Sequence, residues 1–222
     1  MSYANGPKIV TDGLVLYLDA ANRKSYPLSG STIYDLSGNG NNGTFGASTA
    51  APTFSSVNGG VLNFDGGDDI SLTSSSDFAP GTGDFSFQCW INPSSWPSSW
   101  GPIFVVKSTG GLWIGKGSTA IFVLRAYSVA NYIEHDLPTT STWTHISITR
   151  EGTSAKLYYN GSLVDSGTTS QNFIQANASI GTDGGSPHFY GKIPHVMLYK
   201  GKALSANEVQ QNYNALKGRY GL

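Results

Sequence analysis

The segment KLYYNGSLVDSG, residues 156–167, places Asn160-Gly161 between two runs rich in β-forming residues. A two-residue hairpin turn requires positive φ at both central positions, and Asn-Gly is the pair that adopts this conformation most readily. The segment therefore predicts a β-hairpin.

Other segments also have the two-residue period of β-strands. In FSFQCWI, residues 85–91, the Phe, Cys and Ile side chains fall on one face, while Ser86, Gln88 and Trp90 fall on the other. This alternation predicts a half-buried strand, and TWTHISITR, residues 142–150, repeats it. Further strands are predicted at 14–19, 61–65, 69–73, 102–107, 111–116, 120–126, 131–136, 177–181 and 190–199. Strands spaced so closely favour an antiparallel β-sandwich or jelly roll.

One helix is predicted at the end of the chain, in SANEVQQNYNALKG, residues 205–218. Ser205 and Glu208 have the spacing of a capping box. Val209, Tyr213 and Leu216 fall on one face, and Gly218 can end the helix. We expect this short helix to pack its apolar stripe on the sandwich.

Composition narrows the class of protein. The chain has 222 residues, a net charge of -1, 12% charged residues and 28 glycines, which suits one all-β domain. We expect an N-terminal arm at 1–12 and a single domain at 13–222. The lack of basic excess argues against nucleic acid, and no apolar stretch is long enough to insert into a membrane. The N-terminus lacks the pattern of a signal peptide, and the single Cys89 cannot form an internal disulfide, so we expect folding in the cytoplasm.

Several segments in order resemble a known family. They are GLVLYLDAANRKSY, YDLSGNGNNGTF, LNFDGGDDISL, GDFSFQCWINP, WTHISITREGTSAKLYYNGSLV and FYGKIPHVMLYKGKALSANEVQQNYNALKGRYGL. Together they resemble the concanavalin A-like lectin/glucanase superfamily, and within it a laminin G-like (pentraxin-like) jelly roll. DLSGNGNNGT and the NYNALKGRYGL tail are similar to lectin-like proteins of tailed phages, notably marine ones. This resemblance implies an all-β, concanavalin A-like jelly roll and a virion protein assembled in the host cytoplasm.

The sequence predicts no catalytic residues, so we expect the protein not to be an enzyme. Glucanases of this superfamily place carboxylates on one strand in an E-x-D-x-E or E-x-D-x-x-E arrangement, because the chemistry needs a nucleophile and an acid close together on one face. Glu134-His135-Asp136 supplies half of that pattern, but Leu137, Pro138 and Thr139 follow, so the second carboxylate is missing. The simpler interpretation of Glu134 and Asp136 is a solvated strand face.

The sequence predicts no required cofactor. The alternative is a protein that binds one structural Ca²⁺. The family's calcium loops correspond to KSTGG (107–111) and IGTDGG (180–185), which offer only Asp183 as an acid. Ca²⁺ prefers six to eight oxygen ligands. Two other groups of residues could supply oxygens to a Ca²⁺ ion. The first is Asp35, Asn39 and Asn41, and the second is Asp65, Asp68 and Asp69. The simpler interpretation of both is an ordinary turn.

The best candidates for ligand binding are two aromatic residues in a loop. Trp96 and Trp100 lie in QCWINPSSWPSSWGPIF, residues 88–104, where prolines stiffen the loop. A ring of this kind can stack on a sugar, or it can fold over the core as a lid. The further candidates are Trp113, Tyr127, Tyr132, Asp183, His188 and Tyr190.

The sequence thus predicts a non-catalytic, lectin-like recognition module, displayed on a phage capsid or tail fibre, that binds host-surface glycans. The alternative is a capsid or tail decoration protein that binds other virion proteins and no sugar. A symmetric homo-oligomer is a further alternative, because it would bury a surface with so few charges. A degenerate glycan hydrolase is the third interpretation.

Overall fold

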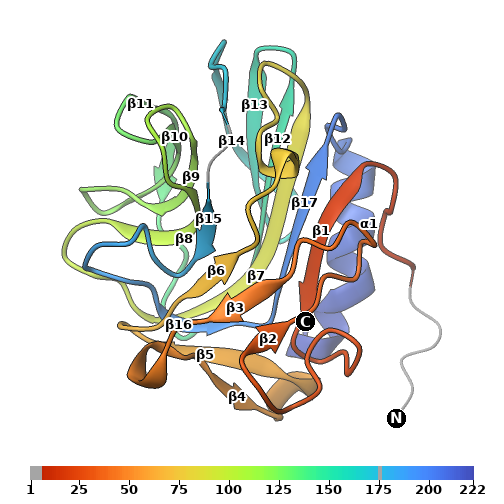
Figure 1. Cartoon of the computed structure of the whole chain (residues 1–222). Coiled ribbons are helices and arrows are strands. Elements are labelled where there is room, and N and C mark those ends of the chain that lie inside the picture. Colours follow the sequence, from red (N-terminus) through yellow and green to blue (C-terminus); the bar gives the residue numbers. More distant parts are fainter. Residues whose placement is uncertain (1–6, 175–176) are drawn as a thin grey trace.

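The chain folds into two antiparallel sheets that face each other (Figure 1), as described by a computed structural model for residues 7–174 and 177–222. The first sheet has the order β14 (Ser162–Thr168), β13 (Ser154–Tyr159), β12 (Thr144–Glu151), β7 (Phe85–Ser95), β16 (Tyr190–Ile193), β5 (Val61–Asp65) and β4 (Thr53–Ser55), with β17 (His195–Lys200) paired to β7 and β1 (Leu14–Asp19) paired to β17. The second has the order β11 (Ala130–Asp136), β10 (Ile121–Ala126), β9 (Leu112–Lys116), β8 (Gly101–Val106), β15 (Ala178–Ile180), β6 (Ile70–Leu72), β3 (Gly43–Phe45) and β2 (Thr32–Ile33). The predicted all-β sandwich is confirmed.

Short helical segments connect or follow the strands. The one α-helix in the described residues is α1 (Ala206–Leu216). The 3-10 turns are η1 (Ser48–Ala50), η2 (Val57–Gly59), η3 (Ser76–Phe78) and η4 (Lys217–Tyr220). Within the described residues, no helix is long and apolar enough to cross a membrane.

The predicted hairpin is present. β13 and β14 pair around Asn160 and Gly161, whose φ angles are 51° and 82°. The Asn160 side chain also accepts a hydrogen bond from the backbone N–H of His145 on β12, at 2.9 Å. This contact joins the turn to the neighbouring strand β12 and helps to fix the register of the hairpin against that strand.

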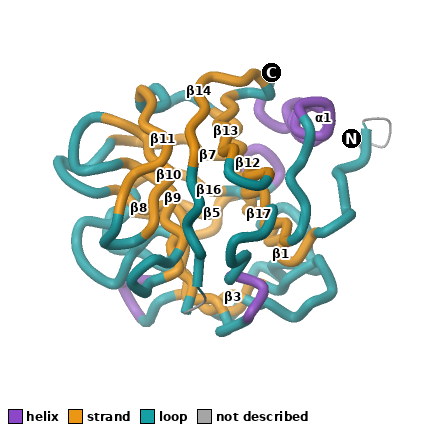
Figure 2. Tube along the Cα trace, turned by 90° about the horizontal axis from the view of Figure 1, so that it is seen from above, coloured by secondary structure: helices purple, strands orange, loops and turns teal. Residues whose placement is uncertain are grey.

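The prediction that the 85–91 strand is half-buried is wrong, because both of its faces are buried. Its Phe, Cys and Ile side chains enter the core between the sheets, while Ser86, Gln88 and Trp90 are 0% exposed on the other face. Helix α1 and the turn after it cover that outer face, on the side of the molecule opposite β8 to β11 (Figure 2). The Asn212 side-chain amide donates to the side-chain oxygen (Oε1) of Gln88 at 2.6 Å, and the Trp90 and Tyr220 rings stack with their centroids 4.2 Å apart. A strand pattern cannot reveal a helix that begins more than a hundred residues later.

Helix α1 begins as predicted and ends differently. Ser205 and Glu208 form the capping box, with the Ser205 hydroxyl accepting from the Glu208 N–H at 3.3 Å. The helix ends at Leu216 and continues as η4, so Gly218 does not end it. Gly221, with φ of 75°, closes the helical segment instead.

The segment 190–199, predicted as one strand, forms two. Pro194 separates β16 from β17 because proline has no N–H for the strand ladder. β17 pairs with the first half of β7, and β16 pairs with the second half. The predicted N-terminal arm lies partly outside the described residues. Within it, the Val10 N–H donates to Asn212 of α1 at 2.7 Å.

Candidate functional site

The side chains on the outer face of the second sheet change in chemical type from one edge of the sheet to the other. Residues paired across antiparallel strands point to the same side of the sheet. One such outward row crosses β3, β6, β15, β8, β9 and β10 in the order Thr44, Ser71, Ser179, Val105, Trp113 and Arg125. The row therefore places hydroxyl groups on one half of this face and aromatic and cationic groups on the other half.

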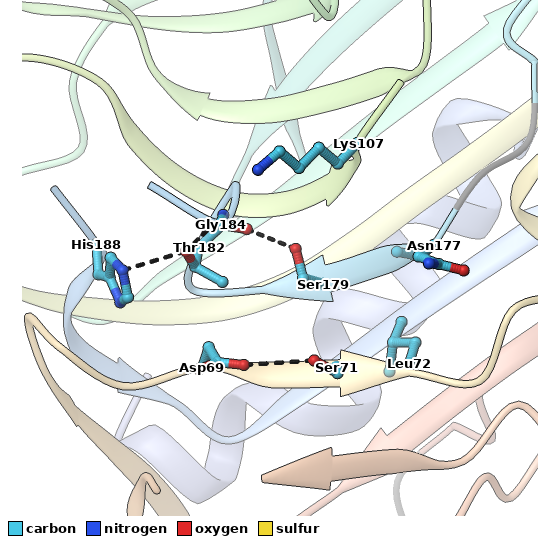
Figure 3. A pocket seen from close by; sticks show the side chains of 10 residues that line it. Asp69, Ser71, Leu72, Lys107, Asn177, Ser179, Thr182, Gly184 and His188 are labelled. Atoms are coloured by element: carbon cyan, nitrogen blue, oxygen red, sulfur yellow. Dashed lines mark hydrogen bonds between the residues drawn. The ribbon is translucent and has the colours of Figure 1, made fainter. Parts of the chain in front are cut away.

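A cavity of about 550 Å³ lies over the hydroxyl half (Figure 3). Asp69 and Ser71 come from the β6 segment, Lys107 from the end of β8, and Thr182 and His188 from the loop after β15. The remaining lining residues are Leu72, Asn177, Ala178, Ser179 and Gly184. Segments far apart in sequence thus converge on one polar cavity.

The loop after β15 is fixed by its own hydrogen bonds. The Thr182 hydroxyl accepts from the Gly184 N–H at 2.8 Å and lies 3.2 Å from Nε2 of His188. The Ser179 hydroxyl donates to the Thr182 carbonyl at 2.6 Å. Nδ1 of His188 lies 3.3 Å from the Asp68 carbonyl oxygen. The wall of the cavity is therefore preorganised by internal contacts.

A second cavity, of about 280 Å³, lies over the aromatic half and is lined by Trp100, Trp113, Arg125, Tyr127, Ser128 and Asp183. Trp113 is only 2% exposed and meets the Trp100 ring edge-on at 5.4 Å, so it supports that ring from below. Trp100 and Tyr127 are half-buried and keep exposed surface. Burial raises the pKa of Tyr127, and the Asp183 carboxylate adds to this shift. Asp183 lines this cavity while Thr182 and Gly184 line the first, so the two cavities adjoin at that loop.

The two tryptophans of the 96–100 loop have different surroundings. The Trp96 indole N–H donates to the Pro138 carbonyl at 2.9 Å, and its ring packs edge-on against the buried Phe189 at 5.9 Å. Trp96 therefore covers the core, while Trp100 at the other end of the loop lines the aromatic cavity.

Lys116 anchors this loop and was missed by sequence reasoning. Its side chain is 4% exposed, and its ammonium group donates to the carbonyls of Ser99, Gly117 and Thr119 at 2.8, 3.0 and 2.9 Å. Burial lowers the pKa of Lys116. The residue before Trp100 is thereby tied to the β9–β10 turn. The available signal was a lysine between two glycines at the end of the strand predicted at 111–116.

Besides Trp96, two more of the predicted ligand residues lie outside the two adjoining cavities. The Tyr132 hydroxyl donates to the Gln171 side-chain oxygen at 3.1 Å, and its ring packs against Phe173. Tyr190 is 45% exposed and lines a separate cavity of about 480 Å³ with Asp65, beside β5 and β16 of the first sheet. The structure thus brings together Trp100, Trp113, Tyr127, Asp183 and His188, and separates them from Trp96, Tyr132 and Tyr190.

The first group considered for calcium is engaged in turn hydrogen bonds. The Asp35 carboxylate accepts from the N–H groups of Tyr17, Ser37 and Asn41 at 2.8, 2.9 and 3.1 Å, and from the Ser37 hydroxyl at 2.6 Å. The Asn39 amide donates to the Leu14 carbonyl at 3.3 Å. The Asn41 amide donates to the Val15 carbonyl at 2.7 Å and to Asp77 at 2.8 Å.

The second group lies at the β5–β6 turn. Asp68 is 3% exposed, and its carboxylate accepts from the Asp65 N–H at 2.7 Å. Burial raises the pKa of Asp68, and the neighbouring carboxylates of Asp65 and Asp69 add to that effect. Across the residues that the structure describes, no group of three or more His, Cys, Asp or Glu side chains is placed to hold a metal ion.

The half-pattern of carboxylates lies on β11, the edge strand of the second sheet. Glu134 is exposed and accepts a hydrogen bond from the Asn131 amide at 2.7 Å. Asp136 is exposed at the end of the strand, where its backbone carbonyl accepts from the Tyr159 hydroxyl at 2.9 Å. Neither residue lines the two adjoining cavities.

These features define a jelly-roll β-sandwich with one hydroxyl-lined and one aromatic cavity on the outer face of one sheet. A family model described as "Concanavalin A-like lectin/glucanases superfamily" matches residues 64–210, and the chain belongs to that superfamily. A search of curated proteins finds no match to this sequence.

Solved structures agree in fold. Domain 4 of AbnA, an extracellular GH43 arabinanase from Geobacillus stearothermophilus solved with arabinotriose, has a TM-score of 0.70 and 21% identity, covering 90% of this chain and 98% of that domain. The binding domain of Paraclostridial Mosquitocidal Protein 1 has a TM-score of 0.72 and 17% identity over 92% of this chain and 52% of its own. A Trypanosoma rangeli sialidase has a TM-score of 0.67 and 16% identity over 96% of this chain and 34% of its own. The present chain therefore spans about half or less of these last two proteins.

Proposed function

We propose that this protein is a non-catalytic carbohydrate-binding module whose ligand lies across the two adjoining cavities on the outer face of the second sheet. The observation that carries the proposal is the row from hydroxyl groups to aromatic rings on that face. A sugar offers both chemistries, because its hydroxyls form hydrogen bonds and its C–H face packs on an aromatic ring. A concave site with aromatic surface and a few fixed polar groups is a common way to hold such a ligand.

Each half of the face has a defined role in this proposal. Trp100 and Tyr127 present ring surface to the apolar face of one sugar ring. Ser71, Ser179 and Thr182 present hydroxyls to the next sugar. Because the loop after β15 and the Trp100 loop are already fixed, binding orders few side chains, and the entropic cost is correspondingly low. The arabinotriose bound to the similar AbnA domain supports a sugar as the ligand class.

The absence of catalysis is part of the proposal. Glycoside hydrolysis uses two carboxyl groups that flank one bond, about 5 to 9.5 Å apart. Among the described residues, Asp69 is the one carboxylate that lines the hydroxyl cavity, and Asp183 is the one that lines the aromatic cavity. A ligand across both cavities would meet these two carboxylates in different halves of the face, and we assign both to hydrogen bonding with sugar hydroxyls.

A glycan array compared across three forms of the protein tests this function. We expect the wild-type chain to bind a subset of glycans, and Trp100→Ala to weaken that binding about tenfold or more, equivalent to roughly 1.4 kcal/mol. Tyr190→Ala is the matched control, because it removes an exposed aromatic ring from the separate cavity. Wild-type protein that binds no glycan would contradict the function, and loss of binding in Tyr190→Ala alone would place the site on the other sheet.

We also propose that the module is displayed on a phage virion, on the capsid or tail, and contacts host-surface glycans there. The resemblance of DLSGNGNNGT and NYNALKGRYGL to lectin-like phage proteins supports this setting. An antibody against the chain should label purified particles in electron micrographs. Labelled particles combined with an absence of glycan binding would favour a decoration protein that contacts other virion proteins.

A further inference from the structure

Arg125 lines the aromatic cavity, and no carboxylate of the described residues pairs with its charge. It projects outward from β10 beside Trp113, and its guanidinium carbon lies 4.1 Å from the centroid of the Trp100 ring. A guanidinium carries five N–H donors. Among the described residues, no hydrogen bond and no ion pair to a carboxylate within 4.0 Å involves Arg125, and its Nε is buried without an acceptor.

The other two partly or fully buried arginines have acceptors for their terminal N–H groups, although Nε of Arg219 is also buried without a partner. Arg150 donates to the carbonyl oxygens of Gly81, Thr82, Gly152 and Gln171 at 2.8 to 3.2 Å. Arg219 donates to both carboxylate oxygens of Asp19, each at 3.1 Å. A half-buried guanidinium held against a ring and left without an acceptor is therefore a local exception in this protein.

We propose that Arg125 receives an oxyanion of the bound ligand, so that the site is selective for acidic glycans. This inference rests on the proposed function and adds the chemical class of the ligand. The oxyanion is the carboxylate of an acidic sugar or a sulfate ester, since a guanidinium binds both through paired N–H groups. The face contact with Trp100 fixes the plane of the guanidinium before the ligand arrives, which lowers the ordering cost of such a pair.

The single carboxylate in the same cavity gives the ligand an orientation. Asp183 accepts a hydrogen bond from the Gly185 N–H at 3.1 Å and is half-buried. The anionic group of a ligand is attracted to Arg125 and repelled by Asp183, whereas sugar hydroxyls can donate to Asp183. The two side chains together therefore favour one direction of the sugar across the face.

The test compares acidic glycans with neutral counterparts of the same backbone. The probes are oligogalacturonate and its methyl ester, and a sulfated galactan and its desulfated form, each titrated by isothermal calorimetry. We expect the wild-type chain to bind one of the acidic probes about tenfold or more tightly than its neutral form, equivalent to roughly 1.4 kcal/mol. The affinity should also fall with added salt, because a charged pair near the surface is screened.

Two substitutions assign the selectivity to this side chain. Arg125→Gln should abolish the preference for the acidic probe, and Arg125→Lys should retain part of it without the paired geometry. Arg23→Gln is the control with the same charge change, because Arg23 is exposed and lines a different cavity. Thermal melts show whether each variant is folded.

The outcomes separate the two proposals. If neutral glycans bind as tightly as acidic ones and depend on Trp100 but not on Arg125, the sugar-binding function stands and the acidic class is overturned. If Arg125→Gln folds and keeps the acidic preference, the role of Arg125 is likewise overturned. If neither the probes nor a glycan array gives binding, both proposals fail.

Discussion

His145 predicts an acid sensitivity that one substitution should remove. The residue lies on β12 beneath α1 and is 0% exposed, with its ring 5.4 Å from that of Trp90 and 5.9 Å from that of Tyr213. Within the described part of the chain, neither ring nitrogen has a hydrogen-bond partner. Burial lowers the pKa of His145 from 6.5 to about 3.

The sign and size of the effect follow from these two pKa values. Between pH 6.5 and pH 3, the unfolded chain binds a proton at His145 that the folded chain does not bind. The contribution of neutral His145 to the free energy of unfolding is therefore fully present above pH 6.5. It is lost as the pH falls toward 3. Between pH 7 and pH 4.5, this one group lowers the free energy of unfolding by about 2.5 kcal/mol.

Replacing His145 by Phe keeps an aromatic ring under α1 and removes the titration. Because two unpaired buried nitrogens also disappear, His145→Phe should be at least as stable as the wild type at pH 7. Urea unfolding followed by tryptophan fluorescence at pH 7 and pH 4.5 measures the difference. His135→Phe is the control, because His135 is a half-buried histidine on the edge strand β11. An equal loss of stability in wild type and His145→Phe between the two pH values would refute the reasoning.

Three further predictions concern the loop and the turns. Trp96→Phe should lower stability by about 1 kcal/mol in a urea titration, through loss of the hydrogen bond to the Pro138 carbonyl, while leaving glycan affinity unchanged; a drop in affinity would give Trp96 a binding role. Lys116→Met should lower stability by about 3 kcal/mol, because three carbonyls lose a charged donor. It should also weaken glycan binding, because the Lys116 ammonium holds Ser99, the residue before Trp100. Unchanged affinity in calorimetry would show that this anchor does not position the Trp100 ring. A chelator should leave the Tm unchanged in a thermal melt, because the Asp35 carboxylate already accepts from four donors, and a fall in Tm would reveal a bound cation.

Local sequence signals predicted those parts of the fold that depend on neighbouring residues. Asn160-Gly161 predicted the hairpin because a short turn depends mainly on its own φ angles. The Ser205 and Glu208 spacing predicted the start of α1 for the same reason. By contrast, the burial of Ser86, Gln88 and Trp90 depends on a helix distant in sequence, and alternation alone read this face as solvent-exposed.

The candidate site was predictable in composition but not in arrangement. Trp96 and Trp100 share one loop and the same Pro/Ser surroundings, yet one ring covers the core and the other lines a cavity. What separates them is the hydrogen bond from Trp96 to the Pro138 carbonyl and the tie from Lys116 to Ser99, both with residues outside the loop. The stacking of Arg125 on Trp100 likewise depends on the register of β10 against β9. Contacts between segments that are distant in sequence cannot be predicted from the sequence of either segment alone.

The most direct test of the glycan site is a crystal structure of the chain with an oligosaccharide selected from the array. The account places the sugar over the second sheet, with one ring against Trp100 and hydroxyls within hydrogen-bond distance of Ser179 or Thr182. An oligosaccharide bound instead beside Tyr190, or at any site away from both cavities, would contradict it.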